Sequence, residues 1–161
     1  MITKLKIVTG GQTGVDRAAL DFALENNIEC GGWCPKNRIA EDGTINDKYP
    51  LVETPSTDSK ERTFRNVKDS DGTIVFIKNK IDEGTGVTID FAEQMNKPLY
   101  VVHLNMNIED QESGVFNWFV ENKIKTLNVA GAKESFCPGI YNETKEFLNK
   151  FLKLFLKRES R

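Results

Sequence analysis

Short apolar runs alternate with segments of helical periodicity along the whole chain of 161 residues. The run over residues 5–9 ends at two glycines and is followed by residues 15–26, in which apolar side chains recur at helical spacing. The apolar runs do not alternate with polar residues, as is typical of strands in a sheet that is covered on both faces. This order of elements predicts an α/β fold with parallel strands.

Further strands and helices alternate along the rest of the chain in the same way. With five parallel strands and right-handed crossovers, the chain is expected to form a three-layer α/β/α sandwich around a mostly parallel sheet of about five strands. A chain of roughly 150 residues can bury about 70% of its unfolded surface in one core, so residues 1–161 are expected to form a single domain. The other predicted strands are 28–33, 72–77, 99–104 and 126–130, and the other predicted helices are 59–68, 87–95, 112–122 and 142–157.

Composition limits the classes of partner. The net charge is -2 and the pI is about 5.6, so the chain lacks the broad positive field that nonspecific nucleic-acid binding requires, and no nucleic-acid partner is expected. No apolar run approaches the roughly 20 residues that span a bilayer, so no membrane partner is expected either. The N-terminus lacks a signal-peptide pattern, and we expect a cytoplasmic protein.

The three cysteines indicate neither a disulfide framework nor a metal site. Any pairing leaves one of them over, which suits a reducing compartment. Cys30 and Cys34 are four positions apart, and with a single histidine in the chain a tetrahedral zinc site would lack ligands. No metal site is therefore expected.

The strongest local signal lies where the first strand gives way to the first helix, at residues 8–17. Glycines there allow a sharp turn and a close approach to a ligand, and the free amides at the start of a helix attract an anion. The spacing fits neither the dinucleotide motif nor the Walker motif, and a purely structural turn capped by Thr13 is the alternative. Arg17 is unfavourable in a first helical turn unless an anion or a carboxylate meets it. The candidate phosphate-binding residues of this turn are Gly11, Gln12, Thr13, Gly14 and Arg17.

Two further glycine-bearing turns are predicted at the same edge of the sheet. One precedes the helix at 87–95, and the other follows the last strand. Because the carboxyl ends of parallel strands share one edge, these turns are expected to border one crevice with the first turn. The candidate residues are Gly84, Thr85, Gly86 and Thr88 in the former, and Gly131, Lys133 and Ser135 in the latter.

A third group of candidates follows the second strand. Trp33 either stacks on a heterocycle or belongs to the core. Lys36 and Arg38 either hold a phosphate or are solvated. They open a long polar segment, 34–60, and a segment of this length in a compact domain is usually functional or disordered.

Seven segments together resemble one known family. GGQTGVDRAALDFA, GGWCPKNRIAEDG, ERTFRNVKDSDGTIVF, EGTGVTIDFA, KPLYVV, LNVAGAKES and PGIY occur in this order between residues 10 and 141, so the resemblance extends over nearly the whole chain. They resemble the molybdenum cofactor carrier family, which is related to the Lonely Guy phosphoribohydrolases and to the wider SLOG group.

The resemblance implies a Rossmann-like fold, a homo-oligomer and a pocket for molybdenum cofactor. This molecule is a pterin that carries a dithiolene and a phosphate. The resemblance also points to the three glycine-bearing turns as the binding residues. One departure is that Ala132-Lys133 stands where relatives read Pro-Arg, so the planar guanidinium that grips a phosphate with two hydrogen bonds is lost there.

Two alternatives come from the same group. The phosphoribohydrolases carry a PGGxGTxxE motif, whose glutamate serves in cleaving the N-glycosidic bond of a nucleoside monophosphate. Here the PGG is missing, and the nearest carboxylate is the shorter Asp90, which would be catalytic only if the chain were such an enzyme. The other alternative is a nucleotide sensor. The sequence favours a binding or carrier protein over both.

Overall fold

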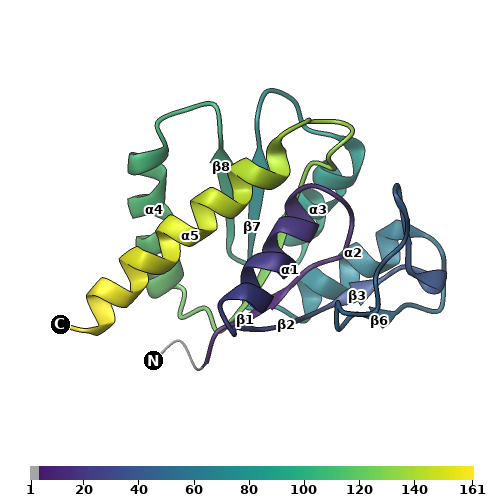
Figure 1. Cartoon of the computed structure of the whole chain (residues 1–161), viewed down its shortest axis with the longest axis horizontal. Helices are drawn as coiled ribbons and strands as arrows, with labels where there is room; N and C mark the ends of the chain where they lie inside the picture. The colour runs from purple at the N-terminus through teal and green to yellow at the C-terminus, as the bar shows by residue number, and fades with distance from the viewer. Residues whose placement is uncertain (1–3) are drawn as a thin grey trace.

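The computed structural model describes residues 4–161. Its centre is a five-stranded sheet in the order β2-β1-β9-β7-β8, and every pair of neighbouring strands is parallel (Figure 1). The predicted mostly parallel sheet of about five strands is confirmed. The strands are β1 (Lys6–Val8), β2 (Glu29–Gly31), β7 (Gly72–Ile77), β8 (Leu99–His103) and β9 (Thr126–Gly131).

Helices cover both faces of this sheet, as the three-layer prediction requires. α1 (Val15–Glu25), α4 (Ile108–Glu121) and α5 (Ile140–Glu159) pack on one face. α2 (Ser59–Lys68) and α3 (Glu83–Gln94) pack against each other on the opposite face (Figure 1). No helix within residues 4–161 is long and apolar enough to cross a bilayer.

Two helices begin about one turn before their predicted starts, because polar side chains cap them. The Asn107 side chain accepts a hydrogen bond from the Asp110 amide, so α4 begins at Ile108. The Asp82 carboxylate accepts from the Thr85 amide at 2.9 Å, so α3 begins at Glu83. The glycines that we expected in a turn before α3 therefore lie inside its first turn.

Most of the hydrophobic core lies between the sheet and α1, α4 and α5. Ile74 and Phe76 of β7 point to this side, and Phe76 packs edge-to-face on Phe147 of α5, with ring centroids 5.2 Å apart. Phe119 and Phe151 continue the core between α4 and α5. Burial of this apolar area is the main stabilising contribution to the fold.

The opposite face of the sheet is more polar. Asn128 and Thr73 are buried on neighbouring strands, and the Asn128 amide donates to the Thr73 hydroxyl at 3.2 Å. Phe64 of α2 packs edge-to-face on Phe91 of α3, but Phe64 remains 41% exposed. This layer therefore buries less apolar surface than the other one.

The segment between β2 and α2, which we predicted as a long loop, is folded on itself. It contains two short two-stranded sheets, and its small core includes Cys34, Ile45 and Leu51. The Arg38 guanidinium organises it by donating to four carbonyl oxygens, those of Ile45, Asn46, Tyr49 and Leu51. Its elements are β3 (Trp33–Cys34), η2 (Lys36–Arg38), β4 (Ile39–Ala40), β5 (Gly43–Thr44) and β6 (Val52–Glu53).

The strand predicted over 28–33 is interrupted at Gly32. This residue has φ +123°, and a Cβ there would lie 2.4 Å from the Thr9 carbonyl oxygen. The chain therefore leaves the central sheet after Gly31 and starts the folded segment at Trp33.

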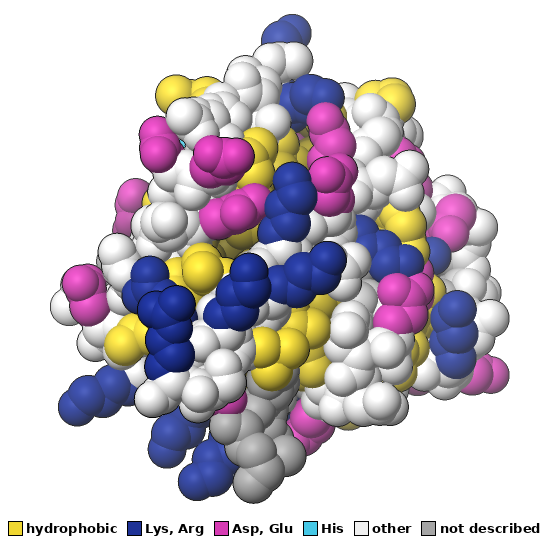
Figure 2. Space-filling view, turned by 60° about the vertical axis from the view of Figure 1, so that its left-hand side comes forward, with side chains coloured by type: hydrophobic (Ala, Val, Ile, Leu, Met, Phe, Trp, Pro, Cys, Tyr) yellow, Lys and Arg dark blue, Asp and Glu magenta, His cyan; other side chains and the backbone are white. Residues whose placement is uncertain are grey.

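The outer surface carries both signs of charge. Figure 2 shows Lys and Arg side chains in a row across the middle of one face, acidic side chains mostly above them, and exposed hydrophobic side chains between them.

The homo-oligomer expected from the resemblance remains a prediction.

Candidate functional site

A cleft of about 390 Å³ lies at the carboxyl ends of β1, β9 and β7. All three predicted turns border it. The first contributes Gly10 and Gln12, the second contributes residues 82–84, and the last contributes residues 128–131 together with Lys133. The strand order explains this arrangement, because β9 lies between β1 and β7 and brings the last turn between the other two.

The fourth wall of the cleft is the first half of α2, which we did not predict as part of the site. Its lining residues are Asp58, Ser59, Lys60, Arg62, Thr63 and Asn66. The sequence does carry a signal for it, because Ser59, Arg62, Thr63 and Asn66 lie at the three- and four-residue spacing that places side chains on one face of a helix.

Arg62 lies across the first turn. Its Nη1 donates to the Gly10 carbonyl oxygen at 2.9 Å. A Cβ at Gly10 would lie 2.7 Å from Cδ of this arginine, so a glycine at this position gives the guanidinium room. Arg62 thereby brings a permanent positive charge to the boundary between α2 and the first turn.

Charges of both signs line the cleft. Lys60, Arg62 and Lys133 supply the cations, whereas Asp16, Asp58, Asp82 and Glu83 supply carboxylates. Two of the carboxylates serve as helix caps: Asp58 accepts from the Lys60 amide, and Asp82 accepts from the Thr85 amide. The two helices α2 and α3 therefore both begin at the cleft.

Backbone amides add hydrogen-bond donors that the protein itself does not use. Within residues 4–161, the amides of Gly10, Ser59 and Gly84 donate to no other group. These three residues line the same cleft and come from the first turn and from the starts of α2 and α3. Free amides at helix starts and glycine turns, together with nearby cations, are the usual components of a phosphate site.

Asp16 is a buried carboxyl group at the base of this arrangement. Its residue is only 7% exposed, and its Oδ2 accepts from the Gln12 amide at 3.2 Å. Burial raises the pKa of Asp16, and the positive charge of Arg62 opposes this rise in part. The positive charge of Arg62 thus partly offsets the negative charge that an ionised Asp16 would bring to the cleft.

Five of the residues that we predicted as binding residues line the cleft: Gln12, Gly84, Thr88, Gly131 and Lys133. Gly14 has another role. A Cβ at Gly14 would lie 2.4 Å from the Ala132 carbonyl oxygen, so this glycine permits close packing of the first turn on the last one. Gly11 also has a positive φ, of +81°, and packs against Leu51 and Ile45 of the folded segment.

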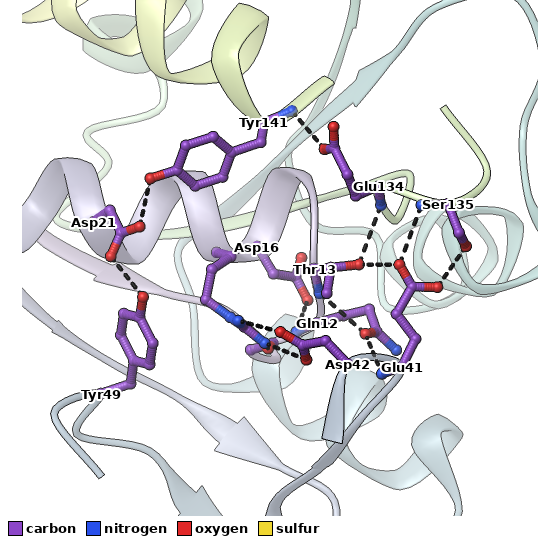
Figure 3. Close-up of polar contacts among 12 residues, drawn as sticks. Gln12, Thr13, Asp16, Asp21, Glu41, Asp42, Tyr49, Glu134, Ser135 and Tyr141 are labelled. Atoms are coloured by element: carbon purple, nitrogen blue, oxygen red, sulfur yellow. Dashed lines mark hydrogen bonds and ion pairs between the residues drawn. The ribbon is translucent and has the colours of Figure 1, made fainter. Parts of the chain in front are cut away.

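Thr13 and Ser135 contact a carboxylate of the protein itself (Figure 3). The Thr13 hydroxyl and both the amide and the hydroxyl of Ser135 donate to Glu41, which lies between β4 and β5. Desolvation opposes ionisation of Glu41, but the hydrogen bonds from Ser135 and Thr13 outweigh it and lower the pKa of this carboxyl. Arg17 likewise meets a carboxylate, because it forms two hydrogen bonds with Asp42.

Four other predicted residues, Thr85, Gly86, Lys36 and Arg38, do not line the cleft. Thr85 and Gly86 are in the first turn of α3, and Gly86 does not have a positive φ. A Cβ at Gly86 would meet only Ile81, at 3.9 Å, so the packing of the protein itself does not require a glycine at this position. Lys36 is exposed, and Arg38 holds the folded segment together.

Two other candidates are placed by their contacts. The Trp33 indole donates to Asp69 at 2.9 Å, and the Arg65 guanidinium lies over its ring, 4.7 Å from the centroid, so this tryptophan packs against α2. Asp90, the candidate for the enzyme alternative, is exposed on α3 and is not a lining residue of the cleft. Within residues 4–161, no group of three metal-ligating side chains occurs.

Comparisons with known proteins agree with this architecture. The model of a family described as "Circularly permutated YpsA SLOG family" matches residues 7–152. A crystal structure from Syntrophus aciditrophicus, described as "Putative molybdenum carrier protein", is 43% identical with a TM-score of 0.90, and the match covers 93% of this chain and 96% of that one. No curated protein matches the chain significantly.

Proposed function

The chain belongs to the circularly permuted YpsA SLOG family, and on this premise we propose that it binds and carries a phosphate-bearing small molecule, namely molybdenum cofactor. The 43% identical protein, described as a "Putative molybdenum carrier protein", supports a carrier role. The observation that carries the proposal is the meeting of three turns and the start of α2 around one cleft.

The phosphate of the ligand is assigned to the side of the cleft that Arg62 borders. Arg62 offers a planar pair of donors, and Lys60 and Lys133 add charge without fixed geometry. The amides of Ser59 and Gly84, at the starts of α2 and α3, complete the donor set. In this assignment Arg62 supplies the two-point grip that Lys133 cannot give at the last turn.

The polar floor of the cleft suits the heterocycle of the ligand. Asn128 and Gln12 line it, and Asp16 adds a carboxyl group whose pKa is raised by burial. A pterin presents ring nitrogens and an exocyclic oxygen and amine at its edge, and side chains of this kind can pair with such groups. The protein's part is to bind, orient and shield the cargo.

The carrier role is preferred to N-glycosidic cleavage because of the position of Asp90. A catalytic carboxylate must lie within hydrogen-bond reach of the reacting group, directly or through one water. Asp90 is exposed on α3 and is absent from the residues that line the cleft. Binding without turnover is therefore proposed, in a cytoplasmic protein that forms a homo-oligomer.

The test measures how much cofactor remains bound to protein that is purified from a host that makes it. Molybdenum and oxidised pterin are measured per polypeptide for the parent and for Arg62→Ala, with Arg65→Ala as the matched control one turn further along α2. The parent and the control should carry both components, and Arg62→Ala should lose most of them. Equal content in all three proteins, or none in the parent, would contradict the proposal.

Two other outcomes identify the alternatives. A bound nucleotide in place of the pterin would favour the nucleotide sensor. Release of free base from AMP over many turnovers, abolished in Asp90→Asn, would favour the phosphoribohydrolase.

A further inference from the structure

A second cavity, of about 220 Å³, adjoins the cleft. Gln12, Ser59 and Arg62 line both cavities, so they form the boundary between the two. The remaining lining residues of the second cavity come from the segment between β2 and α2: Pro35, Ile39, Ala40, Glu41 and Thr57. Nothing in the proposed function uses this space.

The volume of the second cavity suits part of a ligand. Small-molecule pockets usually enclose roughly 300–1,000 Å³. The cleft reaches this range by itself, whereas the second cavity falls below it. Since the two share a boundary, the second cavity fits best as an extension that takes one end of a molecule held in the cleft.

The walls of the second cavity are held in place by hydrogen bonds. The Glu41 amide donates to Gln12 Oε1 at 2.9 Å, and the Glu41 carboxylate accepts from Thr13 and Ser135. Next to the lining residues Pro35 and Thr57 in the chain, the Lys36 amide donates to the Ser56 carbonyl oxygen at 3.0 Å. A cavity whose walls are already ordered costs less conformational entropy to fill.

The chemistry of the boundary and of the walls differs. The boundary carries the Arg62 guanidinium and the free Ser59 amide, which suit an anion. The walls carry the apolar side chains of Pro35 and Ile39 and also the Glu41 carboxylate, which Thr13 and Ser135 already hold by hydrogen bonds. Ile39 is 47% exposed, so its apolar surface is available for contact with a ligand. Apolar surface of this kind suits the face of a heterocycle.

We propose that the protein accepts a ligand with two arms joined by a phosphate link, of the class of 5′,5′-diphosphate dinucleotides. The link lies on Arg62, one arm lies in the cleft, and the second arm lies against Ile39 in the second cavity. This inference rests on the proposed function, since it uses the same phosphate position. It adds a subsite that selects ligands by the group attached to the far side of the phosphate link.

The probes are AMP, ADP and diadenosine 5′,5′-diphosphate, each titrated calorimetrically into the full-length protein. ADP has the second phosphate but no second arm, so its comparison with the dinucleotide isolates the contribution of the second cavity. The dinucleotide should bind at least about tenfold more tightly than ADP, which corresponds to about 1.4 kcal/mol.

Two variants alter the second cavity alone. Ile39→Asp places a charge on its apolar wall, and Thr57→Trp fills it from an exposed position. Both should abolish the advantage of the dinucleotide and leave the affinity for ADP unchanged. Val120→Asp, at an exposed position of α4, is the matched control and should keep the advantage.

The outcomes separate this inference from the proposed function. If ADP binds and the dinucleotide binds no more tightly, or if its advantage survives in both cavity variants, the second subsite is contradicted and the phosphate position stands. If none of the three probes binds, the second subsite is also overturned, and the carrier role is then judged by molybdenum and pterin content alone.

Discussion

The two faces of the central sheet differ in what they bury. Between the sheet and α1, α4 and α5 lies a continuous apolar core that contains Phe76, Phe147 and Phe151. The face under α2 and α3 buries polar groups such as Thr73 and Asn128 and borders the cleft. The comparison indicates a division of roles: one face supplies most of the stability, and the other can keep charges and free amides near its edge.

The largest effect is expected from the apolar face. Phe147→Ala removes a ring that is 2% exposed and packs on Phe76, so it should lower the free energy of unfolding by about 3–5 kcal/mol. Phe64→Ala on the opposite face removes a half-exposed ring and should cost no more than about 1.5 kcal/mol. Urea unfolding of both variants measures the difference. Equal losses of unfolding free energy would contradict the claim that one face supplies most of the stability.

The next effect concerns anion binding on the polar face. Arg62→Ala removes a charge-assisted contact worth about 1.5–3 kcal/mol, so affinity for a phosphate-bearing ligand should fall roughly ten- to a hundredfold. Lys133→Ala should weaken binding less, and the remaining binding should depend less on salt than that of the parent. Calorimetric titrations of both variants with ADP at two salt concentrations measure these effects. A larger loss of affinity in Lys133→Ala than in Arg62→Ala would contradict Arg62 as the main phosphate contact.

Two glycines, one in the first turn and one at the start of α3, should differ in how much the fold depends on them. Gly14 has φ +79° and faces the Ala132 carbonyl oxygen, so Gly14→Ala should destabilise the fold by about 1–3 kcal/mol. Gly86 lies in a helix with open space beside it, so Gly86→Ala should be neutral or slightly stabilising. Thermal unfolding of the two variants distinguishes these positions, and similar melting temperatures would show that neither turn depends on its glycine.

The smallest effect is the pH dependence of the Glu41 contacts. Because the folded-state pKa of Glu41 is lowered, its contribution to stability is present above the unfolded pKa of about 4.3 and is lost as the pH falls through the folded value. Glu41→Gln should cost about 1 kcal/mol at pH 7, and its difference from the parent should shrink between pH 5 and pH 3. Urea unfolding across this range measures it, and a difference that stays constant would mean that the charge of Glu41 contributes nothing.

The sequence predicted the position of the cleft because the alternation of strands and helices and the glycine turns between them are local signals. Three turns after three parallel strands were expected to share an edge, and Gln12, Gly84 and Gly131 do line one cleft. The division between the two faces was not visible, because an apolar strand of three to six residues does not reveal which helix will cover each side.

The sequence did not predict which donors the protein would use itself. Thr13 and Ser135 are paired with Glu41, and Arg38 is paired with carbonyl oxygens, because the segment between β2 and α2 folds back on the turns. The role of Arg62 depends on the same fold, which sets the position of α2. Such contacts join residues far apart in the chain, and no local pattern specifies them.

The most direct test of the central claim, that the polar edge of the sheet is an anion-binding site, is a crystal structure of the protein grown with phosphate. We expect phosphate within hydrogen-bond distance of the Arg62 guanidinium and of at least one of the Gly10, Ser59 and Gly84 amides. Phosphate bound only elsewhere on the molecule, with these donors facing away from the cleft, would contradict the claim.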